Sequence, residues 1–257
     1  EENILDIKNN LSNLIDYAVS YFKELKKKYG AERKRRTEIK TFESIDATKV
    51  VVASKRLYVN KEEGFIGTSM RKDTFVSDCS DIDDIIVFRE NGAMQVVKVD
   101  NKVFVGKDII YCAVFKKKDD RTIYNMIYKD GKSKKTFMKR FPVTSITRGK
   151  EYQLTKSSEG SRVLYFTANP NGEAETVVVN LRKLQKLKKL KINIDFADLA
   201  IKSKTAVGNI VSKNPVKNVE LKSSGVSTLS ARKIWFDNNV NRLNVEERGD
   251  FLGEFKA

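Results

Sequence analysis

The chain has 257 residues, of which 40% are hydrophobic, and it carries 50 Lys and Arg against 34 Asp and Glu, for a formal charge of +16. This hydrophobic content excludes a disordered polycation and predicts one or two substantial cores. No apolar run reaches the roughly 18 residues needed to span a bilayer, so we expect a soluble protein with no membrane-spanning segment. The excess positive charge predicts a polyanionic partner, with nucleic acid first and an anionic membrane surface second.

Histidine is absent from the sequence, and only two cysteines occur, Cys79 and Cys112. The commonest metal ligand and the usual general base near neutral pH are therefore both missing. We expect no metal site and no hydrolytic site in this chain. The cysteines are too few for a disulfide framework and too far apart for a local metal clip, which favours reducing cytosol.

The apolar pattern of residues 4 to 25 predicts a helix. Apolar side chains recur three and four residues apart, as at the a and d positions of a coiled coil: Ile4, Ile7, Leu11, Leu14, Ala18, Tyr21 and Leu25. We expect the helix to end near Tyr29, with Gly30 as a left-handed cap. Its apolar face packs either on a coiled-coil partner or on its own domain. Because the sequence opens at Glu1 without a methionine or an apolar signal segment, we interpret it as part of a larger protein.

A cationic run from Arg33 to Arg36 follows this helix, and a polar stretch continues to Lys49. We interpret the run as solvated linker, although four consecutive cations could also hold a phosphate backbone. The alternating apolar pattern of the next region begins where this stretch ends.

From residue 50 onward, a strand-turn-strand unit recurs every 35 to 39 residues. The six units begin near residues 50, 85, 124, 163, 199 and 234. A β repeat of this length indicates a propeller-type assembly, in which each unit buries its face against its neighbours. We therefore predict a mainly β, propeller-like fold of five or six blades, preceded by a coiled-coil-type helix.

Each repeat is expected to contain a hairpin, because strand patterns flank turn residues. The predicted hairpins join 50–54 to 57–59, 85–88 to 94–97, 124–128 to the strand after Asp130-Gly131, 163–166 to the strand after the turn at 169–172, 199–201 to 207–210, and 234–236 to the strand at Leu243. Shorter apolar stretches at 104–105, 109–115 and 177–179 could supply the other strands of four-stranded blades.

The cations gather in the connectors between these hairpins. If the blades are arranged radially, equivalent connectors fall on one rim and form a positive track that can bind and bend duplex DNA. We assign phosphate contacts to Lys116, Lys117, Lys132, Lys134, Lys135, Lys139, Arg140, Lys186, Lys188 and Lys189. Solubility is the alternative explanation of the same charges. Leucines spaced by three between Leu181 and Leu190 indicate either a short amphipathic helix or an irregular connector.

No motif for direct base reading occurs, so contacts should go to phosphates and be largely indifferent to sequence. The acidic stretch from Asp78 to Asp84 could suggest a divalent-metal site. It is more consistent with a turn cap that repels DNA from that face.

The segment from Tyr29 to Ile39, Tyr-Gly-Ala-Glu-Arg-Lys-Arg-Arg-Thr-Glu-Ile, lies at the end of the predicted helix and ahead of the β repeats. In this setting it resembles the A-type subunit of the bacterial type IIA topoisomerases, and Arg-Arg-Thr-Glu-Ile is its most specific part. The resemblance implies three regions: residues 1–36 as the end of a coiled-coil region, residues 37–48 as a linker, and residues 49–257 as a DNA-binding β-pinwheel.

Where the gyrase branch of this family carries a Gln-Arg-Arg-Gly-Gly-Lys-Gly box, this chain has Gly64 to Lys72 without it. The resemblance therefore favours the topoisomerase IV branch, and it places Arg71 and Lys72 as phosphate contacts at the box position. It also implies ATP-dependent relaxation and decatenation by a larger enzyme. The catalytic tyrosine, ATP and magnesium would belong to parts outside this chain, so no residue here is assigned a catalytic role.

The resemblance implies as partners duplex DNA, the ATPase subunit of such an enzyme, and a second copy of the A-type subunit, in bacterial cytoplasm at the nucleoid. The rival interpretation is a propeller-like protein interaction platform that does not bind DNA. A free-standing enzyme has little support, because neither a histidine base nor a nucleotide-binding glycine loop is visible.

Overall fold

The computed structural model describes residues 2–30, 54–156, 159–185, 187–238, 241–245 and 249–255. The chain divides into two compact units, residues 1–50 and residues 51–257. The predicted linker at 37–48 and the cationic run Arg33 to Arg36 lie outside the described residues, so the three predicted regions stay a prediction. Neither described helix is long and apolar enough to cross a membrane.

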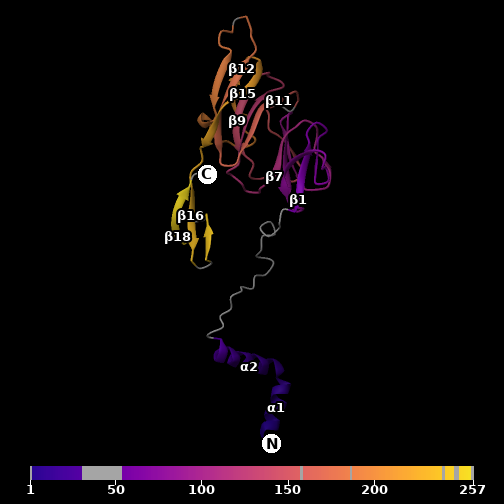
Figure 1. The fold of residues 1–257 in the computed structure, drawn as a ribbon, viewed down its shortest axis with the longest axis vertical. Coiled ribbons are helices and arrows are strands. Elements are labelled where there is room, and N and C mark those ends of the chain that lie inside the picture. Colours follow the sequence, from indigo (N-terminus) through magenta and orange to yellow (C-terminus); the bar gives the residue numbers. More distant parts are fainter. Residues whose placement is uncertain are drawn as a thin grey trace. The chain divides into compact units, whose positions relative to one another are not determined.

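The first unit contains two helices, α1 (Glu2–Ser12) and α2 (Leu14–Tyr29), where the sequence predicted one (Figure 1). The break lies at Asn13, whose φ of −120° and ψ of 48° leave the helical region, and asparagine favours such breaks because its side chain competes for backbone hydrogen bonds. The predicted left-handed cap is also wrong, since Gly30 has φ −78° and ψ −21°.

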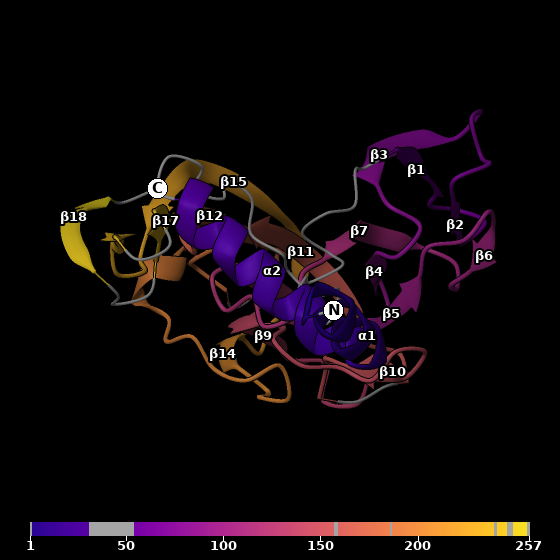
Figure 2. The ribbon, with the colours of Figure 1, turned by 90° about the horizontal axis from the view of Figure 1, so that it is seen from below.

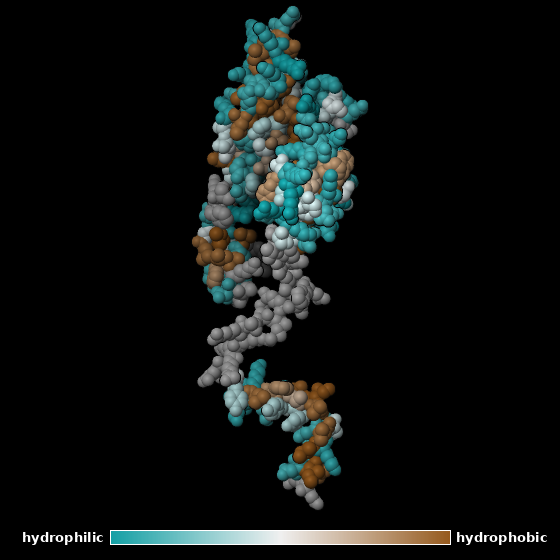
Figure 3. All heavy atoms as spheres, turned by 45° about the vertical axis from the view of Figure 1, so that its right-hand side comes forward, coloured by the Kyte–Doolittle hydropathy of each residue, from teal (hydrophilic) through white to brown (hydrophobic). Residues whose placement is uncertain are grey.

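The apolar side chains of both helices face solvent. Leu5 is 67% exposed and Ile15 is 80% exposed, and α2 has no buried residue. Figure 3 shows the corresponding hydrophobic surface over the helical unit. Coiled-coil pairing would cover this surface, and it stays a prediction.

The second unit is built from five antiparallel sheets, which we call sheets A to E in chain order. Sheet A has the strand order β3 (Thr74–Cys79), β1 (Lys55–Asn60), β2 (Phe65–Gly67), β6 (Val103–Phe104). Sheet B has the order β10 (Glu151–Gln153), β5 (Ala93–Lys98), β4 (Asp84–Arg89), β7 (Ile109–Phe115). Sheet C has the order β11 (Arg162–Asn169), β8 (Ile123–Lys129), β9 (Thr136–Pro142), β14 (Asn209–Ser212). Sheet D has β13 (Lys191–Asp195), β12 (Glu173–Leu181), β15 (Val216–Ser227), and sheet E has β17 (Arg242–Asn244), β16 (Arg232–Asp237), β18 (Asp250–Phe255). A short 3-10 helix, η2 (Phe196–Asp198), follows β13.

Sheets A, B and C share one topology. A central hairpin is extended on one side by a strand that follows it in the chain, and on the other side by a strand that lies in the chain between two strands of the next sheet. Thus β6 lies between β5 and β7 of sheet B in the chain, β10 lies between β9 and β11 of sheet C, and β14 lies between β13 and β15 of sheet D. This exchange ties each of these three sheets to the one after it.

Successive sheets also pack face to face. Because side chains of a strand alternate between its two faces, β4 sends Ile85 and Val87 into the core shared with sheet A, and it sends Ile86 and Phe88 into the core shared with sheet C. Figures 1 and 2 show sheets A and D on opposite sides of sheets B and C. The prediction of a mainly β, propeller-like fold is confirmed, with five sheets among the described residues.

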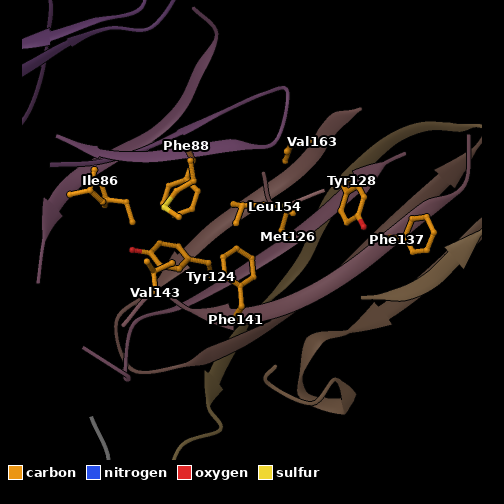
Figure 4. Close-up of a cluster of buried hydrophobic side chains, with 12 residues drawn as sticks. Ile86, Phe88, Tyr124, Met126, Tyr128, Phe137, Phe141, Val143, Leu154 and Val163 are labelled. Carbon is orange, nitrogen blue, oxygen red and sulfur yellow. The ribbon is translucent and has the colours of Figure 1, made fainter. Parts of the chain in front are cut away.

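Aromatic rings dominate the core between sheets B and C (Figure 4). The ring of Phe88 lies 4.7 Å from that of Tyr124 and 4.6 Å from that of Phe166, centroid to centroid. The core between sheets C and D is aliphatic around Phe196 and includes Ile127 and Val177. Each core is therefore an interface between two sheets, so the sheets stabilise one another.

Three of the six predicted hairpins are confirmed, those formed by β4 and β5, by β8 and β9, and by β16 and β17. The first is wrong, because its predicted turn at Lys55 and Arg56 lies inside β1. The fourth is wrong because β11 pairs with β8 while β12 pairs with β13 and β15. The fifth is wrong because Ile201 and β14 both join β9 of sheet C. Alternation identifies a strand, but pairing depends on long-range packing.

Candidate nucleic-acid interface

Arg71 lies in the turn between β2 and β3 and lines a hollow of 470 Å³ on sheet A. Lys55, Arg56, Tyr58 and Thr68 line the same hollow. Three cations around one concave polar surface can bind an anion by charge and by N–H donation. The sequence interpretation missed Lys55 and Arg56, because it placed them in a hairpin turn.

Lys72 lines a second hollow of 470 Å³, together with Lys61, Glu62 and Asp73. Lys72 is exposed, but the two carboxylates reduce the positive potential there. Arg71 is therefore in the more favourable of the two surroundings for a phosphate.

Lys116 and Lys117 are exposed in the connector between β7 and β8. The ammonium of Lys117 lies 3.9 Å from a carboxylate oxygen of Asp84. Asp84 is only 6% exposed, and Arg148 contacts it at 2.8 Å and 3.1 Å. The surface at Lys117 thus combines two cations with one buried anion and keeps a net positive charge.

Part of the predicted acidic turn cap is confirmed beside this cluster. A carboxylate oxygen of Asp83 accepts a hydrogen bond of 2.8 Å from the backbone N–H of Ser80. Within the part of the chain that the structure describes, no three acidic or cysteine side chains gather into a possible metal site.

Lys132 and Lys134 are exposed and Lys135 is half-buried in the turn between β8 and β9. Asp130 organises this turn, because its carboxylate accepts hydrogen bonds from the backbone N–H and the hydroxyl of Ser133 at 2.8 Å and 2.5 Å. Lys134 adopts a left-handed φ of 58°. The three lysines therefore project from a turn whose geometry a neighbouring side chain fixes.

Lys139 is not available to DNA, so its assignment as a phosphate contact is wrong. The side chain is 2% exposed, and its ammonium donates to the carbonyl oxygens of Leu154 at 2.6 Å, Lys204 at 2.7 Å and Ala206 at 3.0 Å. These acceptors account for all three ammonium hydrogens. Burial lowers the pKa of Lys139 from 10.5 to about 7.

The assignment of Arg140 as a phosphate contact is wrong for the same reason. It is 2% exposed and points to the opposite face of β9, toward sheet D. Its guanidinium donates to four acceptors between 2.9 Å and 3.1 Å: the side-chain oxygens of Asn125 and Thr228 and the carbonyl oxygens of Phe196 and Gly172. Burial lowers its pKa, while Glu175 and Asp195 oppose that shift. The two adjacent cations thus join sheet C to the segments on either side of it.

Residues 182–185 and 187–190 are irregular and lie between β12 and β13, at the top of Figure 1. Of the two predicted conformations, these described residues adopt the irregular connector and not the helix. The backbone N–H of Leu181 bonds to the carbonyl of Leu190 at 2.8 Å and closes the loop. Leu187 packs against the core between sheets C and D. Lys188 and Lys189 are exposed, while Lys186 lies outside the described residues.

More cations surround this loop than the sequence interpretation assigned. The exposed ones are Arg182, Lys183, Lys191, Lys213 and Lys217. Pairing of Leu181 with Val216 brings Lys217 close to the loop, and the N–H of Arg182 bonds to the carbonyl of Pro215 at 2.8 Å. Lys213 and Lys217 come close to this loop through the long-range pairing of β12 with β15. A count of charges along the sequence does not identify them.

The exposed assigned cations therefore lie in four non-equivalent connectors: between β2 and β3, between β7 and β8, between β8 and β9, and between β12 and β13. The second and third connectors stand at opposite ends of β8, so the prediction of one rim formed by equivalent connectors is wrong for these two clusters. Each position carries two or more cations on a loop or turn. Such a series can contact a polyanion through several phosphates at once, which raises affinity without reading bases.

A family model described as "Topoisomerase C-terminal domain, Bacteroidota" matches residues 56–224. The A subunit of DNA topoisomerase 4 from Borreliella burgdorferi is 26% identical over 217 residues, which cover 84% of this chain and 33% of that protein. The chain thus spans about a third of this curated relative. A crystal structure of the C-terminal domain of DNA topoisomerase IV aligns with a TM-score of 0.47 at 9% identity, over 72% of this chain and 65% of that one.

Proposed function

Because the chain belongs to the topoisomerase C-terminal domain family, we propose that its β-sheet unit binds duplex DNA without sequence preference and bends it. The observation that carries the proposal is the placement of exposed cations on loops and turns of successive sheets, where each can reach a phosphate. Bending 20–30 base pairs by 40–90° costs about 1–6 kcal/mol, which several phosphate contacts can offset.

The proposed contacts are the exposed members of the predicted set and the half-buried Lys135, extended by the exposed cations that surround them. They are Lys55, Arg56, Arg71, Lys72, Lys116, Lys117, Lys132, Lys134, Lys135, Arg182, Lys183, Lys188, Lys189, Lys191, Lys213 and Lys217. Lys139 and Arg140 are removed, because their donors are taken inside the protein.

We place this unit in the A-type subunit of a topoisomerase IV-like enzyme, in line with the relative from Borreliella burgdorferi. It would hold a DNA segment while the rest of the enzyme performs ATP-dependent relaxation and decatenation. The larger assembly would supply ATP, magnesium, the catalytic tyrosine, the ATPase subunit, and a second copy of the A-type subunit. The proposed location is the bacterial cytoplasm at the nucleoid.

Neutralising the loop of sheet D should weaken duplex binding in a salt-dependent way. The double variant Lys188→Gln, Lys189→Gln is expected to reduce the slope of log K against log salt by about 1.8, since each phosphate contact contributes about 0.9. Fluorescence anisotropy with two unrelated 30-base-pair duplexes at several salt concentrations measures this slope. Both duplexes should weaken equally, because phosphates carry no sequence information.

The matched control is Lys8→Gln, Lys23→Gln on the exposed surface of the helical unit, which should leave the slope unchanged. An unchanged slope in the loop variant would remove that loop from the interface. If the wild-type chain binds neither duplex near physiological ionic strength, the DNA proposal fails and a protein interaction platform takes its place.

A further inference from the structure

A cavity of 670 Å³ lies between the connector from sheet B to sheet C and sheet E. It is separate from the cation clusters described above. Its walls include one aromatic ring and five charged side chains: Trp235, Arg121, Arg232, Lys233, Asp120 and Glu254. The volume lies within the range of about 300–1,000 Å³ that is typical of small-molecule sites.

Hydrogen bonds hold two walls of this cavity in place. Arg121 follows Asp119, whose carboxylate accepts from the backbone N–H of Arg121 at 2.9 Å and from the hydroxyl of Thr122 at 2.7 Å. A guanidinium N–H of Arg121 then reaches the carbonyl of Ser230 at 3.2 Å, so the connector is joined directly to the segment before sheet E.

That segment has a second anchor. The hydroxyl and the backbone N–H of Thr228 both donate to the carbonyl of Gly172, at 2.9 Å and 3.1 Å. Arg140 in turn donates to the Thr228 hydroxyl at 2.9 Å. The cavity is therefore bounded by segments that are tied to the buried network of sheet C.

Two enclosed donors at the cavity have no hydrogen-bond partner among the described residues. They are Nε of Arg121 and Nε1 of Trp235. An enclosed donor without a partner is costly, and the presence of two such donors distinguishes this wall from the rest of the sheet surface.

We propose that this cavity binds one nucleoside monophosphate unit, free or as an unstacked nucleotide of a single strand. The indole of Trp235 offers a stacking surface for the base, and the cations Arg121, Arg232 and Lys233 offer donors for the phosphate. The carboxylates of Asp120 and Glu254 accept from an exocyclic amino group. Few other ligand classes combine a planar ring, amino donors and a phosphate, which are the three features that these walls match.

The experiment uses the fluorescence of Trp235, which is the single tryptophan of the chain. The full chain is titrated with dAMP, dTMP, inorganic phosphate and single-stranded (dA)8. We expect dAMP to change the emission saturably, dTMP to bind about tenfold more weakly because it lacks an amino group, and phosphate to bind at least about fivefold more weakly because it lacks the base. Tighter binding of (dA)8 than of dAMP assigns the site to a strand, and weaker binding assigns it to the free nucleotide.

Two variants test the walls. Arg121→Gln should weaken dAMP binding at least about tenfold. Because this variant also loses the bond to Ser230, Lys233→Gln serves as a second test on an exposed side chain and should weaken binding about threefold. Lys98→Gln, an exposed cation of β5 outside the cavity and the cation clusters, should have no effect. Circular dichroism verifies that each variant is folded.

Three results would each overturn the proposal: no saturable change with any probe, equal affinity for phosphate and dAMP, or unchanged dAMP binding in both wall variants. The proposal does not depend on duplex binding. Anisotropy of a labelled duplex should be unaffected by saturating dAMP, so the failure of one proposal leaves the other standing.

Discussion

Replacing Arg140 with Met is expected to lower the free energy of unfolding by about 3–5 kcal/mol, as measured for buried charges that lose a partner. The substitution removes the donors of four hydrogen bonds that join β9 to Asn125, η2, the turn at Gly172 and Thr228. In a unit of about 200 residues, this loss should lower the Tm by roughly 6–20 °C. Thermal denaturation followed by circular dichroism measures it.

The loss is large because Arg140 also balances a buried carboxylate. The Asn125 amide donates to Glu175 at 2.8 Å while it accepts from Arg140 at 3.0 Å, and Glu175 is 5% exposed. Adding Glu175→Gln to Arg140→Met should therefore cost less than the sum of the two single changes, with a coupling of about 0.5–3 kcal/mol.

Arg182→Met, on the exposed loop of sheet D, is the matched control and should change stability by no more than about 0.5 kcal/mol. The two sites also differ in their predicted effect on DNA. Arg140→Met should leave the salt slope of duplex binding unchanged at temperatures where the variant is folded. A stable variant with a reduced slope would instead return Arg140 to the interface.

The repeat period predicted a series of packed β units, although β11, at the start of the fourth predicted unit, joins the sheet of the third. Its physical basis is visible in β4, where Ile85 and Val87 face one neighbour and Ile86 and Phe88 face the other. A continuous apolar run of this kind predicts a strand buried on both faces. The period could not predict that β6, β10 and β14 pair outside their own repeat, because these strands have two to four residues and their partners are set by tertiary packing.

The density of Lys and Arg along the sequence predicted the candidate site less well than the pattern of buried and exposed positions in each strand. Lys139 and Arg140 are flanked by Phe137 and Phe141 in a strand whose faces are both covered. Any cation in such a strand must be buried, so the alternation itself contained the signal against a surface role. Lys217, in contrast, reaches the loop of sheet D through the pairing of β12 with β15, which only the folded chain specifies.

Lys139→Met should destabilise the β-sheet unit by about 2–4 kcal/mol, because three carbonyl oxygens lose their donor while the aliphatic packing is kept. The carbonyls belong to Leu154, Lys204 and Ala206, so the segments after β10 and before β14 should open first. Hydrogen exchange resolved by segment tests this order, with Lys132→Met in the exposed turn as the control.

The stability difference between wild type and Lys139→Met should depend on pH with a defined sign. Burial lowers the pKa of Lys139 from 10.5 to about 7, so between these values the unfolded chain binds a proton that the folded chain does not. Stability then rises with pH by up to about 1.4 kcal/mol per unit in this window, and the contribution is constant below it. The variant lacks this term, so its deficit against wild type should grow as pH rises from 7 to 10. A deficit that stays constant over that range would mean that the three carbonyl oxygens, which favour the ammonium, outweigh burial and hold its pKa at or above the unfolded value.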